Sequence, residues 1–142
     1  MFDIAHIHPM VVHFPIALII VGFFADIASL IFTREKCLST MGFYLEILGL
    51  VAVIVAYGTG YFLTGVMEGE AGQVRNQHEL FATVTLVTII IACLFRVVIM
   101  YMEKDKTSLK YLFIGFYFLA AVFVGITGYL GGSLVMDYMV GI

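Results

Sequence analysis

The hydropathy pattern is the feature that most constrains this chain. Four long apolar stretches cover about residues 11–32, 41–64, 80–102 and 112–134, and short polar segments separate them. Each stretch is near or above the roughly 20 residues that an α-helix needs to cross a bilayer. The sequence therefore predicts an all-α, polytopic membrane four-helix bundle that forms a single transmembrane domain over residues 1–142.

Composition supports a membrane protein and excludes some other classes. Hydrophobic residues make up 63% of the 142 residues and charged residues 12%, whereas soluble domains have about 45–50% and about 25%. We therefore expect a lipid bilayer around the chain. The net charge of -3, without a basic stripe, argues against a nucleic-acid partner. Cys37 and Cys93 belong to no CxxC or CxxCH motif, so we do not expect covalently attached haem. Cys37 lies in a polar segment and Cys93 inside an apolar stretch, so we do not expect a disulfide between them.

The distribution of Lys and Arg predicts the orientation. The segments before the second and fourth apolar stretches hold five of these residues, and the segment before the third holds one, Arg75. Positive charge marks the cytoplasmic side. The termini and the middle segment are therefore predicted to face outward, N-out and C-out, in a bacterial inner membrane. The five residues are Arg34, Lys36, Lys104, Lys106 and Lys110.

All four histidines then fall at the outer face. His6, His8 and His13 precede or open the first apolar stretch, and His78 precedes the third. Ionisable residues in membrane segments usually mark a functional site. Two prolines follow closely behind histidines, and because proline suits the first turn of a helix, the first helix is expected to start near one of them. The sequence does not decide whether the helix starts at Pro9 or at Pro15.

The sequence predicts two similar helical hairpins that cross the membrane in the same direction. The first helix begins HFPIAL at His13 and the third begins HELFAT at His78, with Ala17 and Ala82 one turn further along. The second ends GTGYFLTG and the fourth GITGYLGG. Parallel repeats imply a pseudo-twofold axis along the membrane normal. On this alignment His13 and His78 face each other across the bundle.

The first functional hypothesis is a non-covalent haem b. Two imidazoles on facing helices can hold an iron porphyrin in a four-helix bundle, here His13 and His78. Small residues line one face of the second and fourth helices and become more frequent toward this end. They indicate either close helix packing or room for a flat macrocycle. His8 would be a supporting partner or an alternative ligand. The residues expected to line the cofactor are Ala17, Ala82, Gly60 and Gly128.

On this hypothesis the protein is cytochrome b-like. It would transfer electrons, for example between a quinone and a periplasmic carrier or partner subunit. The sequence contains no nucleophile–base pair and no phosphate loop, so it favours an electron carrier or binding subunit over a stand-alone enzyme.

Two alternatives remain at the level of sequence. His8, His13 and His78 together would be a three-histidine set of the kind that binds zinc or copper with an open position. In the other alternative the histidines only cap helices, and the chain is a cofactor-free assembly subunit of a membrane complex. The small-residue stripes would also suit contacts within a homodimer.

A second polar layer lies deeper in the apolar stretches. Asp26 and Arg96 each lie seven residues before the polar segment that follows their stretch, and Glu46 lies seven residues after Ser39. All three are therefore about 10 Å into the membrane at 1.5 Å per residue. Unpaired charge there is costly. We therefore expect a structural ion pair at these positions rather than a proton path.

The segment HPMVVHFPIAL, from His8 to Leu18, resembles the opening of a bacterial membrane family catalogued as domain of unknown function 2231. The resemblance extends over nearly the whole chain. It includes an acidic residue late in the first helix, a histidine opening the third, and the endings GYLGGSLV from Gly128 and Val-Gly-Ile at Val140–Ile142. Members are often found beside cytochrome or other redox modules, so the resemblance implies electron transfer and haem.

The chain departs from the family pattern at its C-terminal tail. Members often carry a further histidine shortly after the Gly-Gly pair, where this chain has Tyr138 or Met139. The resemblance therefore implies His8, His13 and His78 as the shared set and no ligand in the tail.

Overall fold

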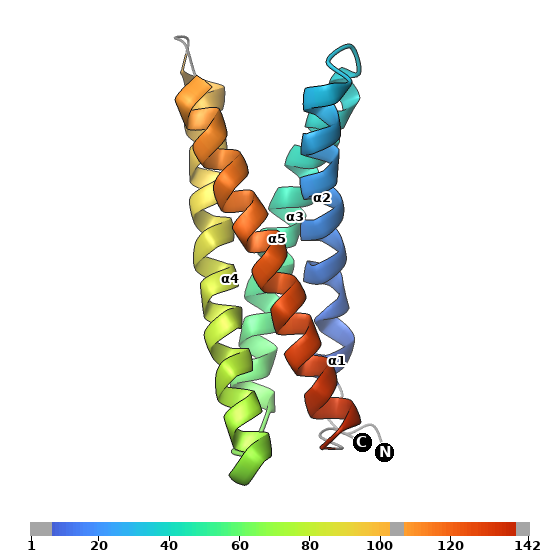
Figure 1. The fold of residues 1–142 in the computed structure, drawn as a ribbon, viewed down its shortest axis with the longest axis vertical. Coiled ribbons are helices and arrows are strands. Elements are labelled where there is room, and N and C mark those ends of the chain that lie inside the picture. Colours follow the sequence, from blue (N-terminus) through green and yellow to red (C-terminus); the bar gives the residue numbers. More distant parts are fainter. Residues whose placement is uncertain (1–6, 103–106, 139–142) are drawn as a thin grey trace.

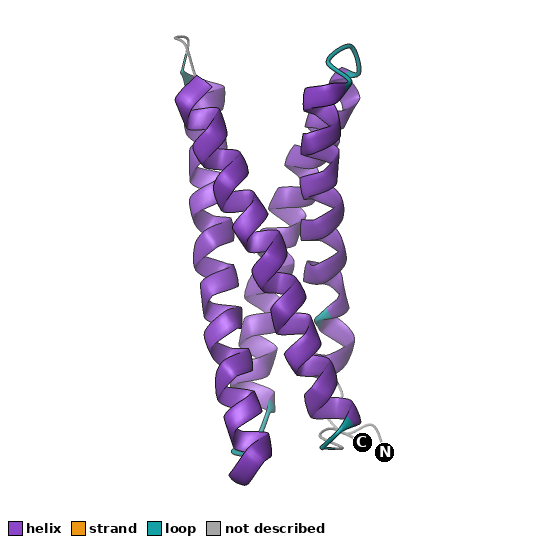
Figure 2. Cartoon of the chain, in the orientation of Figure 1, coloured by secondary structure: helices purple, strands orange, loops and turns teal. Residues whose placement is uncertain are grey.

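The computed structural model describes residues 7–102 and 107–138, and these residues are almost entirely helical (Figures 1 and 2). The described part contains five helices and no strand: α1 (Ile7–Val11), α2 (His13–Ile31), α3 (Lys36–Leu63), α4 (Gly69–Tyr101) and α5 (Thr107–Met136). Several residues used in the sequence analysis lie outside the described ranges: His6, Lys104, Lys106, Met139 and Val140–Ile142.

The first membrane span is built from α1 and α2, with a break at Val12 (Figure 2). The structure uses both prolines that the sequence offered as helix starts: Pro9 is the third residue of α1, and Pro15 the third residue of α2. Proline has no N–H, and its ring clashes with the carbonyl four residues earlier. For Pro15 that carbonyl belongs to Val11, the residue at which α1 ends.

Four helical segments are long and apolar enough to cross a membrane: Ile7–Ile31, Lys36–Leu63, Gly69–Tyr101 and Ser108–Met136. They confirm the predicted class of fold, but several bounds differ from the hydropathy estimate. The largest difference is at α4, which begins at Gly69 rather than near residue 80. A helix of 33 residues is about 50 Å long, more than the roughly 30 Å hydrocarbon core. Its polar first turns therefore extend beyond the apolar layer.

The helices pair as two hairpins, α2 with α3 and α4 with α5. Figure 1 shows the beginning of α1, the end of α5 and the α3–α4 connection at one end of the bundle, which we call the terminal end. The α2–α3 connection lies at the opposite end, where the two hairpins diverge (Figure 1). The α3–α4 connection ends at Gly69, whose φ of 66° is in the left-handed region that favours glycine.

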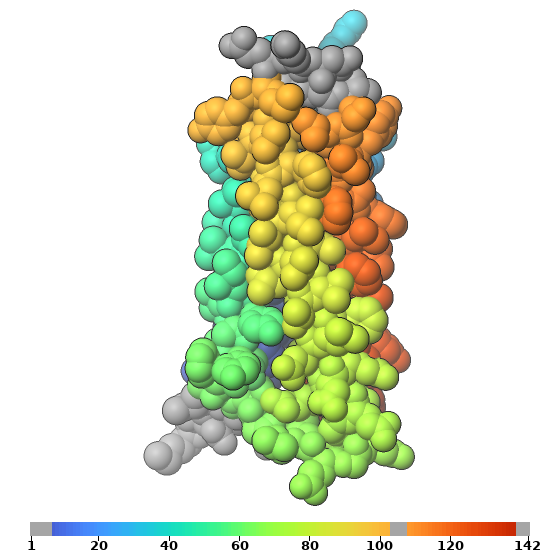
Figure 3. Space-filling model, turned by 90° about the vertical axis from the view of Figure 1, so that its left-hand side faces the viewer, coloured from blue at the N-terminus to red at the C-terminus, as the bar shows by residue number. Residues whose placement is uncertain are grey.

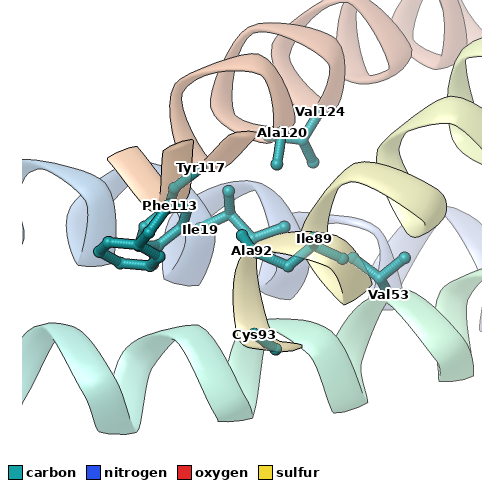
Figure 4. Close-up of a cluster of buried hydrophobic side chains, with 9 residues drawn as sticks. All are labelled: Ile19, Val53, Ile89, Ala92, Cys93, Phe113, Tyr117, Ala120 and Val124. Carbon is teal, nitrogen blue, oxygen red and sulfur yellow. The ribbon is translucent and has the colours of Figure 1, made fainter. Parts of the chain in front are cut away.

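A narrow apolar core lies between the hairpins (Figure 4). Ile19, Ile89 and Ala120 are fully buried in it, one from each of α2, α4 and α5. Large apolar side chains also cover the outside, where Phe24 is 63% and Leu94 60% exposed. Such a surface suits lipid tails, which solvate apolar side chains as a protein core does.

Buried positions recur 70 residues apart in α2 and α4. Ile19 corresponds to Ile89, and Asp26 to Arg96, and all four are buried. By the same numbering His78 corresponds to His8. The sequence alignment that pairs His78 with His13 differs from this pattern by five residues, which is more than one helical turn.

Candidate functional site

The terminal end of the bundle contains a cavity of about 650 Å³, lined by residues of all five helices. That volume falls within the range of small-molecule and cofactor pockets. In Figure 3 the surface is hollowed between α3 and α4, and dark blue atoms of the first helix are visible through the opening. His8, His13 and His78 line the cavity together with small residues predicted for the site, Gly60, Ala82 and Gly128.

His8 reaches the cavity from α1 and is held by α3. Its Nδ1 lies 3.0 Å from Oγ1 of Thr59. That hydroxyl already donates its proton to the carbonyl of Ala56, at 2.9 Å. The hydroxyl can therefore only accept from His8, so Nδ1 carries the hydrogen and the neutral ring keeps its free lone pair on Nε2.

His78 reaches the cavity from α4 and is held by α5 in a similar way. Its Nδ1 lies 3.0 Å from the carbonyl oxygen of Thr127. A carbonyl only accepts hydrogen bonds, so Nδ1 of His78 is also the protonated nitrogen and Nε2 carries the lone pair. Within the described residues, neither Nε2 has a hydrogen-bonding partner.

The two rings lie against each other. Their centroids are 6.1 Å apart and their planes are nearly perpendicular, at 85°. Each ring also packs against a glycine: a Cβ on Gly60 would lie 2.9 Å from Cε1 of His8, and one on Gly131 would lie 3.1 Å from Cε1 of His78. Each ring is thus oriented by one hydrogen bond, as ligating histidines are. Each ring also has one close contact with a glycine backbone.

His13 is arranged differently. Its Nδ1 hydrogen-bonds to the carbonyl oxygen of Pro9 at 2.8 Å, and the residue is exposed although it lines the cavity. Ala17 is exposed and is not among the lining residues, contrary to the prediction. In α2 the buried positions are Pro15 and Ile19. His13 and Ala17 are two residues before them, and at about 100° per residue they point to the other side of the helix.

The facing pair is therefore His8 and His78, and not the pair of His13 and His78 that the sequence repeat predicted. The three-histidine alternative also finds no support in the geometry. Among the described residues, no three His, Cys, Asp or Glu side chains are close enough together to hold a metal ion.

Several residues at the cavity were missed by the sequence analysis. Thr59 and Thr127 orient the histidines, Gly131 packs against His78, and Arg75 lines the cavity. The signal for the threonines was present, because both stand in the repeated TGY segments. What the sequence did not provide was the rotation of each helix that turns these threonines toward a histidine.

The fold and the cavity define a four-helix membrane protein with a pair of histidines held in a cavity at one end. The chain belongs to the family described as "Predicted membrane protein (DUF2231)", whose profile matches residues 5–142. This confirms the resemblance seen in the sequence. No curated protein and no solved structure matches the chain.

Proposed function

We propose that the cavity binds a haem b between His8 and His78 and that the protein transfers electrons in the membrane. The observation that carries the proposal is the pair of imidazoles, each held through Nδ1, with Nε2 left to coordinate. Metal-bound histidines almost always donate their other ring N–H to a carbonyl, carboxylate or similar acceptor. Both acceptors are already in place in this chain.

The two rings are close enough for both to hold one group. The observed centroid separation is 6.1 Å. When bound, a haem with two histidine ligands has no open coordination position and supplies one-electron transfer rather than oxygen chemistry.

The cavity walls also suit a porphyrin. They are mainly apolar, and Gly60 and Gly131 leave room for the two rings. Arg75, which also lines the cavity, is suited to pair with the carboxylate groups at the edge of the macrocycle. The predicted orientation would place this end on the outer side of a bacterial inner membrane. There a quinone and a periplasmic partner would be the natural donor and acceptor.

We also propose that the two hairpins are parallel repeats with a register of about 70 residues. Support comes from the buried pairs Ile19–Ile89 and Asp26–Arg96, and from the threonines of the two TGY segments, each bonded to one histidine. In this register His8 and His78 are equivalent, so one pseudo-twofold axis would pass between the two ligands.

An absorption spectrum of the purified protein tests the proposed function. We expect a Soret band and, after reduction, the α-band of a low-spin b-type haem, with iron near one per chain by elemental analysis. A protein without these bands, even after haem is added, contradicts the proposal. Zinc or copper near one per chain without iron would replace it with a bare metal site.

Thr59→Val tests the orientation of His8. The substitution keeps the side-chain shape but removes the oxygen that accepts from Nδ1. Loss of such a supporting hydrogen bond typically lowers metal affinity about 10- to 100-fold. We expect haem titrated into the apoprotein to bind more weakly by a factor in that range. Thr83→Val is the matched control, because Thr83 hydrogen-bonds Tyr57 rather than a histidine. Equal affinities for the two variants would contradict the assigned role of Thr59.

Gly131→Val tests the close backbone contact at His78. Even the first added carbon would lie 3.1 Å from the ring, and a branched side chain would push the ring out of position. We expect low haem occupancy in a protein that still inserts and remains monodisperse. Gly115→Val is the control, since no atom lies within 4 Å of a Cβ at that position. Full occupancy in Gly131→Val would show that the ring does not need this space.

A further inference from the structure

A cluster of charged side chains is buried between the hairpins, away from the histidine cavity. Nη1 of Arg96 on α4 lies 2.5 Å from Oδ2 of Asp26 on α2 and 3.2 Å from Oε2 of Glu46 on α3. Nη2 of the same guanidinium donates to the carbonyl oxygen of Ser39 at 2.7 Å. Exposure is 8% for Arg96, 5% for Asp26 and 0% for Glu46. The ion pair expected at this depth is thus a triad of two acids and one base.

The charges of this triad do not balance if both acids are ionised. The other titratable groups that act on Glu46 or Asp26 are Cys93 on α4, Tyr117 on α5 and Lys110. The thiol and the phenol are neutral, and Lys110 is exposed near the opposite end. One uncompensated charge would then be buried in the membrane interior, which is costly. A single bound proton removes that cost.

The hydrogen bonds indicate which acid holds the proton. The guanidinium is closer to Asp26 than to Glu46, so Asp26 is the ionised partner. Oε1 of Glu46 is buried, and within the described residues neither this oxygen nor the hydroxyl of Tyr117 has a hydrogen bond of ordinary geometry. Besides Arg96, the side chain that bonds to the Glu46 carboxyl group is the thiol of Cys93, which is only a weak donor. An ionised carboxylate oxygen left without a donor would be strongly disfavoured at this position. A neutral carboxylic acid at Glu46 fits it better.

The triad is connected to an open polar vestibule at the opposite end of the bundle. This vestibule has a volume of about 440 Å³, and it is lined by Ser29, Thr33, Glu35, Lys36, Ser39, Thr40 and Lys110. One of its residues bonds directly to a side chain of the triad, because the carbonyl of Ser39 accepts from Arg96. The hydroxyl of Ser29 donates to the backbone carbonyl of Asp26 at 2.7 Å. The vestibule therefore reaches the guanidinium of Arg96, which contacts both acids.

We propose that Glu46 is a proton-binding site in the membrane interior and that its proton exchanges with water through this vestibule. The ligand is a proton from the aqueous phase at the end opposite the histidine cavity. His78 and Arg96 are 18 residues apart along α4, or about 27 Å. The proton site and the histidine pair are thus separate, and the inference does not depend on the cofactor.

Infrared spectroscopy of the full-length protein in lipid vesicles tests this site. At neutral pH we expect the carbonyl stretch of one protonated carboxylic acid, which shifts when glutamate carboxyl groups carry ¹³C. The band should be absent from Glu46→Gln, an isosteric change, and retained in Glu70→Gln, which alters an exposed acid. A band that moves only with labelled aspartate, or no band in the wild-type protein, overturns the assignment.

The route is tested by transferring the vesicles into D₂O. The wild-type band should shift as the proton is replaced by deuterium. A Thr33→Leu/Thr40→Leu variant, which fills the vestibule, should slow that shift. Val66→Leu is the control, because it enlarges an exposed apolar side chain at the terminal end, away from the vestibule. Exchange at the wild-type rate in the vestibule variant would overturn the proposed route and leave only the site.

Discussion

His78→Ala is expected to abolish haem binding, and His8→Ala to do the same. Each substitution removes one of the two nitrogens that would coordinate the iron, and no other histidine ring lies against the remaining one within the described residues. The purified variants should lack the Soret band, or show a weakly bound five-coordinate species that is lost on gel filtration. Expression and oligomeric state should be unchanged, because both rings stand at the wall of a cavity rather than in the core.

His13→Ala is the decisive control for this prediction. The sequence repeat assigned His13 as the partner of His78, whereas the structure leaves it exposed and bonded to Pro9. We therefore expect His13→Ala to retain the spectrum with at most a modest loss of affinity. A variant series in which His13→Ala loses the cofactor while His8→Ala keeps it would contradict the ligand pair and restore the sequence-based one.

Arg96→Met is expected to cause the largest loss of stability of any single substitution in the buried triad. It removes the only buried cation in the described residues. That cation neutralises Asp26 and also contacts the carboxyl group of Glu46. Breaking a buried ion pair from one side typically costs about 3–5 kcal/mol. Reversible unfolding in mixed detergent micelles should show a decrease of that order in the free energy of unfolding. The folded variant should also bind a second proton at neutral pH, because Asp26 has lost its cation.

A triple variant separates the loss of the charge from the loss of packing. Asp26→Leu/Glu46→Leu/Arg96→Met replaces the whole triad with apolar side chains, and such replacements are often neutral or stabilising. We expect it to be more stable than Arg96→Met alone. Arg34→Met, a change at an exposed arginine, should have little effect. If the triple variant is less stable than Arg96→Met, the triad contributes through its packing and not through charge balance.

The sequence predicts the class of fold well because the determining property is local. A bilayer requires about 20 consecutive apolar residues per helix, and four such stretches can be counted without knowing how they pack. The helix bounds were less accurate. The polar residues from Gly69 onward are helical although they add nothing to hydropathy, since a helix continues into water until the chain provides a stop signal.

The histidine pair shows the limit of reasoning by local similarity. His13 and His78 matched because each opens an apolar stretch with similar neighbouring residues. His8 lies five residues before His13 in the same span, and its ring is the one that reaches Thr59 and His78. A shift of five residues changes the helical face by more than 100°, and local sequence similarity does not detect such a rotation.

The sequence by itself determined four apolar helices, histidines gathered at one end of the bundle, and three charges at a depth where they must pair. Those features follow from hydropathy and from position along the chain. Only the tertiary structure decided that His8 rather than His13 faces His78, that glycines leave room for both rings, and that one oxygen of Glu46 has no hydrogen bond of ordinary geometry within the described residues. Each of these depends on the rotation and packing of helices distant in sequence, which are fixed by contacts across the bundle.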